Sequence, residues 1–270
     1  EFQEPLLKYY EEHPEFIRPE TRRNEVISFV KSGLKDLSIS RSTFDWGIPL
    51  PFDEGHVAYV WADALLAYLT GIGYGDEKRE GEFEARWPMQ YHFVGKDITR
   101  FHCVIWPAML MAAGLPIPRT VFGHGFLLVK GEKMSKSKGN GVKPEDLVKV
   151  FGVDAYRYYF LSDVQFGHDG SISLERMVQV YNADLANTWG NLCSRVFNMT
   201  KKYFDFKVPS APTGAENNPL KEIADSLYAE YDACMTDVDF TGAAAAVQKL
   251  ASRVNLYVEE SAPWNLAKSE

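Results

Sequence analysis

Short apolar runs typical of β-strands alternate with helical patterns through the first half of the sequence. Residues 57–61 read as a strand that leads into a helix over about 62–70. Residues 91–94 repeat this plan with a helix over 98–113, and residues 120–130 supply a third strand-rich unit. Strands that alternate with helices predict βαβ units and a parallel sheet, so we expect an α/β fold.

Small and polar residues mark the expected strand ends. Gly95 supplies a turn after the second strand, Asp97 reads as a helix N-cap, and Pro107 predicts a kink in the following helix. Ligands of open parallel sheets bind beyond the carboxyl ends of the strands. We therefore expect a ligand site near Trp61, residues 95–97 and residues 123–125.

The first 24 residues are polar and interrupted by prolines, and we expect little core there. Residues 25–34 read as a short helix that Gly33 ends.

The pattern becomes helical in the second half. Pro144 at a first helical position and Gly152 just beyond the last predict a short helix, and residues 153–162 predict another. From Ser173 to Tyr203 apolar residues recur every three or four positions, which predicts one long amphipathic helix. A loop and two further helices follow. The layout is an α/β domain followed by a helical bundle.

Composition narrows the class of protein. The hydrophobic share of 46% and the charged share of 24% are ordinary for a globular chain. A net charge of −8 argues against a protein that binds nucleic acid mainly through non-specific attraction to the phosphate backbone, although it is compatible with a local basic site. No apolar run approaches the roughly 20 residues that span a bilayer, so we expect no membrane insertion.

The three cysteines, Cys103, Cys193 and Cys234, are far apart in the sequence and form no CxxC pair. This spacing predicts neither a disulfide framework nor a zinc site. It suits reduced thiols, and we expect a cytoplasmic protein.

Residues 130–141 hold four lysines, two serines and three glycines directly after the apolar run 126–129. Composition alone leaves two interpretations open, because these residue types suit both a solvated linker and a mobile loop that carries chemistry.

The stretch "KMSKSKGN" (133–140) is the signature sequence of class I aminoacyl-tRNA synthetases, and the chain resembles the methionyl-tRNA synthetase family along nearly its whole length. The other stretches that carry the resemblance are "VWADALLAY" (60–68), "HFVGKDITRFH" (92–102), "VFGHGFLLVKGE" (121–132), "FGVDAYRYYFL" (151–161), "NADLANTWGNLCSR" (182–195) and "APW" (262–264). They occur in the family's order and at its spacing, which favours the catalytic interpretation of the loop.

The resemblance implies a domain order. Residues 1–24 would be a remnant of a connective insertion, and residues 25–129 the second half of a Rossmann-like, parallel-sheet catalytic domain. Residues 130–172 would carry the signature loop and a region that contacts the tRNA stem. Residues 173–270 would form an all-α anticodon-binding helix bundle, incomplete at its C-terminal end.

The resemblance implies ATP-dependent activation of methionine to methionyl-adenylate, followed by transfer to tRNA(Met). Lys133 and Lys136 are the expected catalytic pair, with Lys136 the more important, and Lys138 is not assigned a role. Negative charge builds on phosphate oxygens as pyrophosphate leaves, so lysines on a mobile loop can stabilise the transition state.

For ATP, supplied as its Mg²⁺ complex, the resemblance implies the binding residues Lys96, Asp97, His124, Gly125 and Lys136. Two of these have other interpretations. The competing interpretation of His124 is a strand-end histidine with a local hydrogen bond, and that of Asp97 is an N-cap with no ligand.

For methionine, the resemblance implies a pocket of Trp61, Ala64, Leu65, Tyr68, Ile98 and His102. A flexible, polarizable thioether suits an apolar and aromatic pocket with few polar contacts. Family members often carry Pro where Leu65 stands, and core packing is the competing interpretation for each aromatic residue.

Asn191, Arg195 and Trp264 match the family's anticodon-reading set. An aromatic ring can stack on a splayed base, and amide and guanidinium groups can hydrogen-bond base edges. The competing interpretation places Asn191 and Arg195 on an ordinary solvated helix face and Trp264 in the core.

Parts of the family pattern are missing. None of the six histidines lies in a His-Ile-Gly-His motif, and the zinc-binding cysteines of the connective insertion are absent, so we expect no metal and no zinc site. The resemblance then implies an internal piece that acts with the missing N-terminal half of the same enzyme and is inactive alone.

Three alternatives remain. The chain could belong to a class I synthetase of the same subclass for leucine, isoleucine, valine or cysteine, which the residues Trp61, Tyr68 and His102 disfavour. It could be a non-catalytic tRNA-binding fragment. A nucleotidyltransferase without tRNA function would leave the anticodon-like helices unexplained.

Overall fold

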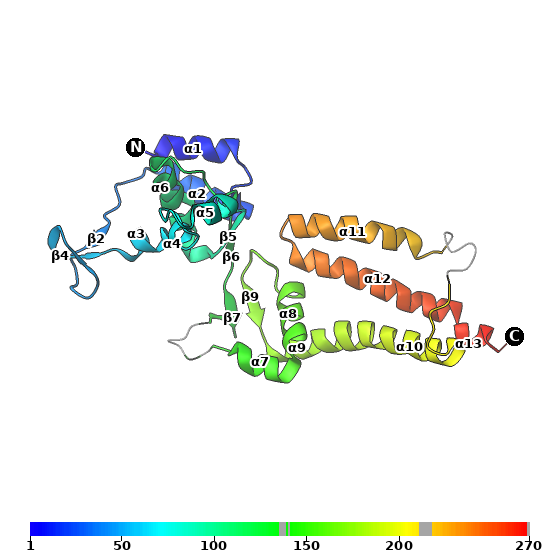
Figure 1. Cartoon of the computed structure of the whole chain (residues 1–270). Coiled ribbons are helices and arrows are strands. Elements are labelled where there is room, and N and C mark those ends of the chain that lie inside the picture. The colour runs from blue at the N-terminus through cyan, green and yellow to red at the C-terminus, as the bar shows by residue number, and fades with distance from the viewer. Residues whose placement is uncertain (135–138, 140, 211–217, 269–270) are drawn as a thin grey trace. The chain divides into compact units, whose positions relative to one another are not determined.

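A computed structural model describes residues 1–134, 139, 141–210 and 218–268. The chain divides into two compact units, residues 1–124 and residues 125–270 (Figure 1). An α/β unit followed by a mainly helical unit confirms the predicted fold class.

Three parallel strands form the first sheet, in the order β1-β6-β5. Strand β6 (Thr120–His124) lies between β1 (Ile17–Arg18) and β5 (Tyr91–Gly95). Its first four residues are buried, as expected of a central parallel strand. The register pairs Gly95 with His124, so both strands end at the same edge of the sheet.

The expectation of little core in residues 1–24 was wrong. Helix α1 (Gln3–Glu12) places Leu6 and Tyr10 four residues apart on one face, and both are buried. They pack in the same core as β1, α2 (Glu20–Lys31) and the middle of the sheet. Prolines and charges in this segment lie on its outer faces and turns, so a count of polar residues underestimates its contribution to the core.

The predicted strand at residues 57–61 does not belong to the parallel sheet. Strand β4 (Asp53–Ala58) instead pairs antiparallel with β2 (Ser40–Arg41) and β3 (Pro49–Leu50) in a separate sheet. It ends three residues before Trp61, which lies on helix α3 (Val60–Ala64). Short apolar runs do not distinguish a parallel from an antiparallel strand, which is why the sequence pattern failed here.

The segment after β5 is helical throughout, as predicted, but its turns vary. It contains a 3₁₀ turn η1 (Lys96–Ile98), a π-helical turn η2 (Phe101–Ile105) and α6 (Trp106–Ala112). Pro107 near the start of α6 has no N–H to offer the carbonyl oxygen of Cys103, four residues earlier. The buried Tyr10 hydroxyl donates to that oxygen over 2.6 Å.

The remaining helices of the first unit are short. They are α4 (Ala67–Thr70) and α5 (Glu80–Arg86). Leu69 of α4 and Trp87 after α5 pack with Trp106 and Leu110 in a second core cluster. This cluster lies behind the candidate pocket described below.

The second unit begins with a small sheet in the order β8-β7-β9. Its strands are β7 (Leu127–Val129), β8 (Glu132–Lys133) and β9 (Gly170–Ile172). Gly125 precedes β7 at a close backbone approach, since a Cβ atom there would lie 2.2 Å from the carbonyl carbon of His168. The Phe126 N–H donates to the Asp169 carboxylate over 2.8 Å and fixes this approach.

Two short helices follow, as the sequence predicts. Helix α7 (Pro144–Phe151) ends at Gly152, which has a positive φ of 80°, and α8 (Val153–Ser162) begins directly after it. Leu147 of α7 and Tyr159 of α8 pack on Ile172 of β9 in the core of this part of the unit.

The predicted long helix is also present. It runs without a break through α9 (Leu174–Val180), a π-helical segment η3 (Tyr181–Gly190) and α10 (Asn191–Phe204). Ser173 caps its start by accepting a hydrogen bond from the Arg176 N–H.

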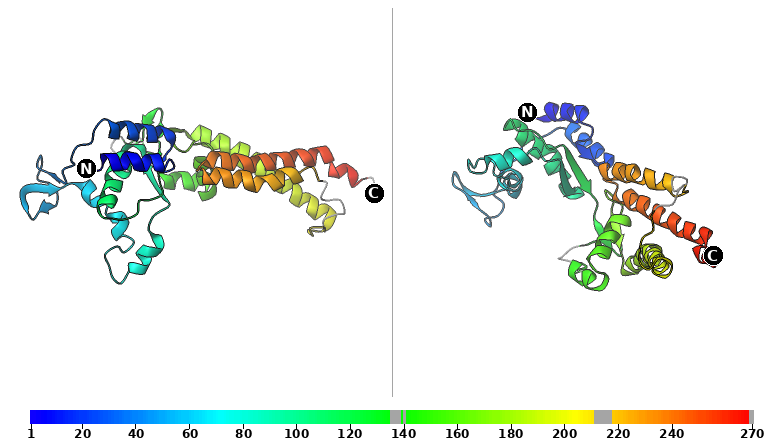
Figure 2. Two further views of the ribbon diagram at one scale, coloured as in Figure 1. Left: turned by 90° about the horizontal axis from the view of Figure 1, so that it is seen from above. Right: turned by 45° about the vertical axis from the view of Figure 1, so that its right-hand side comes forward.

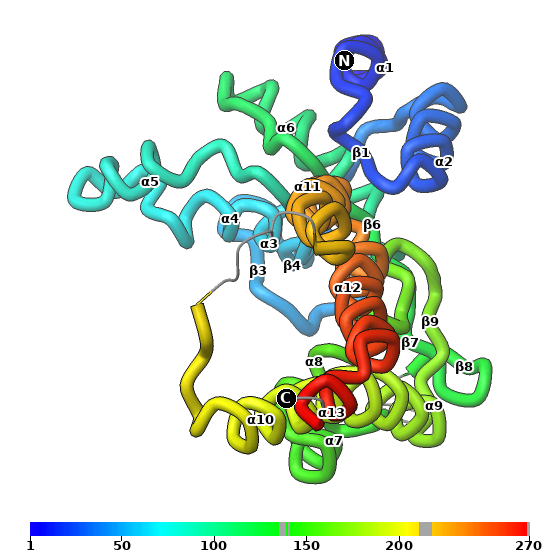
Figure 3. The backbone as a smooth tube through the Cα atoms, turned by 90° about the vertical axis from the view of Figure 1, so that its right-hand side faces the viewer, coloured from blue at the N-terminus to red at the C-terminus, as the bar shows by residue number. Residues whose placement is uncertain are grey.

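The last three helices complete the bundle. They are α11 (Lys221–Thr236), α12 (Phe240–Ser261) and α13 (Pro263–Leu266). Helix α11 lies alongside α12 (Figure 2), and the view along the bundle shows α12 between α11 and the long helix (Figure 3). Among the described residues, no helix has both the length and the apolar character to cross a membrane.

Candidate functional site

Three of the predicted methionine-pocket residues, Trp61, Tyr68 and Ile98, converge on a fourth, His102. The Tyr68 hydroxyl lies 2.8 Å from His102 Nε2, and His102 Nδ1 lies 3.0 Å from the carbonyl oxygen of Ile98. The Trp61 ring meets the His102 ring edge-to-face at 5.9 Å. Helix α3, helix α4 and the segment after β5 therefore bring these residues to one place.

The hydrogen bonds of His102 fix its tautomer. A carbonyl oxygen only accepts, so Nδ1 carries the proton that is shared with Ile98. In the neutral ring Nε2 must then accept, and the Tyr68 hydroxyl donates to it. The Tyr68 oxygen keeps lone pairs that can accept a hydrogen bond, and it is the polar group of this otherwise aromatic cluster.

The other two predicted residues play lesser parts. Leu65 is fully buried and packs with Trp106 and Leu110, so it supports the pocket from behind. Ala64 is partly exposed at the end of α3. Core packing, the competing interpretation, therefore holds for Leu65.

Sequence reasoning missed three aromatic neighbours of this cluster. Phe101 stacks on Trp61 at 4.1 Å, His92 meets Tyr68 at 4.4 Å, and Trp106 lies 6.0 Å from Tyr68. His92 could have been found from strand alternation, because it shares the buried face of β5 with Val94. Trp106 follows His102 by four residues and so shares its helix face.

Burial keeps the pocket histidines neutral. Desolvation, followed by the nearby His102, lowers the pKa of His92 to about 4. Desolvation also lowers the pKa of His102, against a weaker opposite effect of its bond to Ile98. At neutral pH the cluster is therefore aromatic and uncharged, which suits an apolar side chain.

The predicted ATP residues of the first unit lie at the carboxyl edge of the parallel sheet. His124 ends β6 opposite Gly95, and Lys96 and Asp97 follow Gly95 directly. A cavity of about 270 Å³ is lined by Glu25, Val26, Lys96, Asp97, Thr99 and Arg100. Asp97 is not the N-cap, because that position is occupied by Gly95 without a side-chain cap.

The predicted residues of the second unit are only partly described. Lys133 is exposed on β8, with Nζ 3.5 Å from the centroid of the Phe126 ring. Lys136 lies outside the described residues. The backbone at Gly125 passes so close to that of His168 that a side chain would not fit there. This packing explains the glycine without any contact to a ligand.

Two of the three predicted anticodon residues, Asn191 and Arg195, line one groove, and the third, Trp264, lies beside Arg195. The groove has a volume of about 560 Å³ and is lined by Asn187, Thr188, Asn191 and Arg195 from the long helix and by Ser252, Asn255, Leu256 and Glu259 from α12. Arg195 Nη2 lies 2.8 Å from a Glu259 carboxylate oxygen, and the Arg195 guanidinium lies 5.8 Å from the Trp264 ring.

The groove lining is polar and carries few charges. Three asparagines, a threonine and a serine line it together with one leucine, one arginine and one glutamate. The Trp264 ring lies beside the arginine. Asn187 and Asn255 were not predicted from the sequence. Such a lining can hydrogen-bond and stack unpaired bases. Within the described ranges, no cluster of three or more His, Cys, Asp or Glu side chains could hold a metal ion.

Comparisons with known proteins agree on one family. The profile described as tRNA synthetases class I (M) matches residues 1–197. The methionine–tRNA ligase of Caldanaerobacter subterraneus subsp. tengcongensis is 53% identical over 98% of the chain. The methionine–tRNA ligase of Streptomyces coelicolor is 50% identical over the whole chain.

Solved structures give the same result. Mycobacterium tuberculosis methionyl-tRNA synthetase bound by methionyl-adenylate aligns over the whole chain with a TM-score of 0.91 and 46% identity. The free form of that enzyme aligns with a TM-score of 0.88 and 44% identity.

The chain spans about half the length of these proteins, or less. It covers 42% of the Caldanaerobacter relative, 50% of the Streptomyces relative and 53% of the Mycobacterium chain. Over that span the similarity extends through both units. The chain belongs to the methionyl-tRNA synthetase family of class I aminoacyl-tRNA synthetases.

Proposed function

We propose that this chain forms part of a methionine–tRNA ligase, which activates methionine with ATP and transfers it to tRNA(Met) for translation. The observation that carries the proposal is the convergence of Trp61, Tyr68 and Ile98 on a neutral His102 in a chain of this family.

The pocket chemistry supports methionine as the amino acid. A thioether is apolar, flexible and polarizable, and favours contacts with aromatic rings. Trp61 and Tyr68 supply such rings, and the Tyr68 oxygen supplies one polar contact next to them. Aliphatic substrates such as leucine, isoleucine and valine would gain nothing from that oxygen, so this set favours methionine over the other synthetases of the subclass.

For ATP, bound as its magnesium complex, we propose Lys96, Asp97 and His124 at the edge of the parallel sheet and Gly125 at the start of β7. The first three residues lie at the ends of paired strands or directly after them, which is where ligands of such sheets bind. Lys133 and Lys136 would stabilise the charge that develops on phosphate oxygens as the methionine carboxylate attacks and pyrophosphate leaves.

We propose that the groove between the long helix and α12 reads the anticodon. Trp264 would stack on an unpaired base, while Asn191 and Arg195 would hydrogen-bond base edges. The acidic overall charge is compatible with this role, because recognition would depend on a few specific contacts.

The sequence motifs also suggest that the catalytic site needs a further part. A His-Ile-Gly-His motif is absent from the 270 residues, and we propose that it is supplied by an N-terminal half of the same enzyme. The isolated chain should then catalyse no methionine-dependent ATP–pyrophosphate exchange. Binding of methionine tRNA without exchange is also what a non-catalytic tRNA-binding fragment, the second candidate, would show.

A chimaeric enzyme separates these candidates. These residues would replace the matching segment of the Caldanaerobacter relative, and ATP–pyrophosphate exchange would be measured with methionine. We expect exchange by the chimaera, and we expect Lys136→Ala to slow adenylate formation about 100- to 1,000-fold with little change in methionine binding. Lys143→Ala, an exposed lysine just before α7, is the matched control and should behave as wild type.

Two results would count against the proposal. An inactive but folded chimaera would favour the non-catalytic candidate. Equal losses in methionine binding and adenylate formation for Lys136→Ala would contradict the transition-state role of that lysine.

A further inference from the structure

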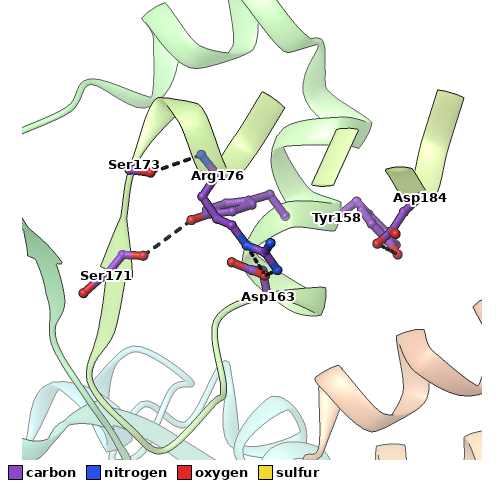
Figure 4. Close-up of polar contacts among 7 residues, drawn as sticks. Tyr158, Asp163, Ser171, Ser173, Arg176 and Asp184 are labelled. Carbon is purple, nitrogen blue, oxygen red and sulfur yellow. Dashed lines mark hydrogen bonds and ion pairs between the residues drawn. The ribbon is translucent and has the colours of Figure 1, made fainter. Parts of the chain in front are cut away.

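The hydroxyl group of Tyr158 joins three elements of the second unit. Gln248 of α12 donates its Nε2–H to the Tyr158 oxygen over 2.7 Å. The same hydroxyl donates to Oδ2 of Asp184, on η3, over 2.8 Å (Figure 4). One side chain of α8 therefore holds α12 and η3 together.

The two elements that Tyr158 joins are the two walls of the groove. Asn187 and Thr188 follow Asp184 by about one turn on η3, and Ser252 follows Gln248 by about one turn on α12. A second link lies within the groove itself, where Asn255 Nδ2 donates to the Thr188 carbonyl oxygen over 2.9 Å. These bonds together set the separation of the walls.

Helix α8 is a firm anchor for these bonds. Tyr159 is buried against Ile172 and Met177, which fixes α8 to β9 and α9. At the end of the helix, Asp163 accepts from Arg176 Nε over 2.9 Å (Figure 4). The Tyr158 hydroxyl thus projects from a packed base toward the two walls.

The wall that contains Asp184 has an unusual backbone. Segment η3 is π-helical, and the Thr188 hydroxyl donates to the carbonyl oxygen of Ala183, five residues earlier. Such turns are rare and occur frequently at functional sites.

The protonation state of Tyr158 is compatible with both bonds. Burial is the main cause that raises its pKa to about 12, so the phenol keeps its proton at neutral pH. It can then donate to the carboxylate of Asp184 while its oxygen accepts from Gln248.

We propose that Tyr158 is a positioning residue for the anticodon groove, although it does not line the groove. Its hydroxyl holds η3 and α12 at the separation that lets Asn191 and Arg195 of the long helix and Trp264 of α13, which follows α12, contact the same RNA loop. This inference rests on the proposed function for the identity of the RNA, but the positioning itself can be tested without RNA.

The test uses the full 270-residue chain with Tyr158→Phe, which removes only the hydroxyl group. Tyr159→Phe is the matched control, because it is the neighbouring residue and also loses one hydrogen bond, a 3.4 Å contact with the Ser171 carbonyl oxygen. Gln248→Met breaks the same network from the other wall. The first readout is amide hydrogen exchange in residues 182–190 and 250–257. The second is the affinity for an RNA hairpin whose loop carries CAU, the methionine anticodon, compared with a hairpin whose loop sequence is altered.

We expect Tyr158→Phe and Gln248→Met to speed exchange in both walls, and Tyr159→Phe to leave it unchanged. We expect affinity for the CAU hairpin to fall about 10-fold in the first two variants, with less preference over the altered loop. Unchanged exchange in Tyr158→Phe would overturn the positioning role, as would an RNA affinity equal to that of Tyr159→Phe. Failure of the wild-type chain to prefer CAU would refute the proposed RNA function, while the exchange comparison would still decide the role of Tyr158.

Discussion

Tyr10 makes a hydrogen bond that the backbone around Pro107 requires. The proline leaves the Cys103 carbonyl without its usual partner in the helix, and the buried Tyr10 hydroxyl donates to that oxygen over 2.6 Å. A buried acceptor that loses its partner costs about 1–3 kcal/mol. Tyr10→Phe should therefore lower the free energy of unfolding by about that amount in denaturant titrations.

The neighbouring residue gives the control for this prediction. Tyr9→Phe changes a half-buried tyrosine on the same helix and should have a much smaller effect. If the two variants were equally stable, the bond to Cys103 would contribute nothing measurable.

His92 should make stability depend on pH. Its pKa is about 4 in the folded chain, mainly because of burial, whereas an unfolded histidine titrates near 6.5. As pH falls through 6.5 the unfolded state takes up a proton first, so the contribution of His92 to stability is constant above that pH and declines down to about 4. The loss should reach about 3 kcal/mol at pH 4.

Replacement of the histidine isolates this effect. His92→Phe should remove that part of the pH dependence between pH 7 and pH 4, as measured by denaturant titrations at each pH. His168→Phe is the matched control, because it also exchanges a histidine for a phenylalanine but at an exposed position. An identical slope in His92→Phe and wild type would show that His92 titrates normally.

Residues of the pocket were predictable to different degrees. Tyr68 and His102 were predicted from the family resemblance, and the structure brings them within 2.8 Å of each other. His92 and Trp106 were missed because each looks like an ordinary core residue in its own segment. Only the packing of β5 against the helices shows that both lie beside Tyr68.

At the scale of elements, Gly125 controls how β7 meets the turn before β9. A Cβ atom there would lie 2.2 Å from the carbonyl carbon of His168, so the backbone would have to move. Gly125→Ala should destabilise the second unit by about 1–3 kcal/mol or more and lower its thermal unfolding midpoint.

Gly81→Ala is the opposite case. Gly81 lies in helix α5 with no atom within 4 Å of an added Cβ, so alanine should be neutral or stabilising by up to about 1 kcal/mol. A Gly125→Ala chain as stable as Gly81→Ala would show that the sheet tolerates the extra carbon.

Helices were predicted better than strands. The long helix, α7 and α8 have caps and apolar spacing that local chemistry determines. Strands β2 and β3 have two residues each, and their pairing with β4 depends on contacts that are distant in sequence. For the same reason the sequence could not show that residues 1–24 add β1 to the parallel sheet.

At the scale of the whole chain, the proposed binding of RNA in the groove between the long helix and α12 can be tested directly. Trp264→Ala should weaken binding of a CAU hairpin by about 1–3 kcal/mol, because a stacked base would lose its aromatic partner. Trp46→Ala removes a tryptophan that is 88% exposed in the first unit and should leave affinity unchanged. Equal affinities of the two variants would place the bound RNA elsewhere.

The amino acid that the enzyme activates is the central claim. ATP–pyrophosphate exchange by the chimaera should be measured with methionine, leucine, isoleucine, valine and cysteine in parallel. Methionine should support exchange with a kcat/KM about 100-fold or more above each of the others, because only its thioether matches the aromatic pocket around Tyr68 and His102. Exchange with any of the other four at a rate equal to or above that with methionine would contradict the account.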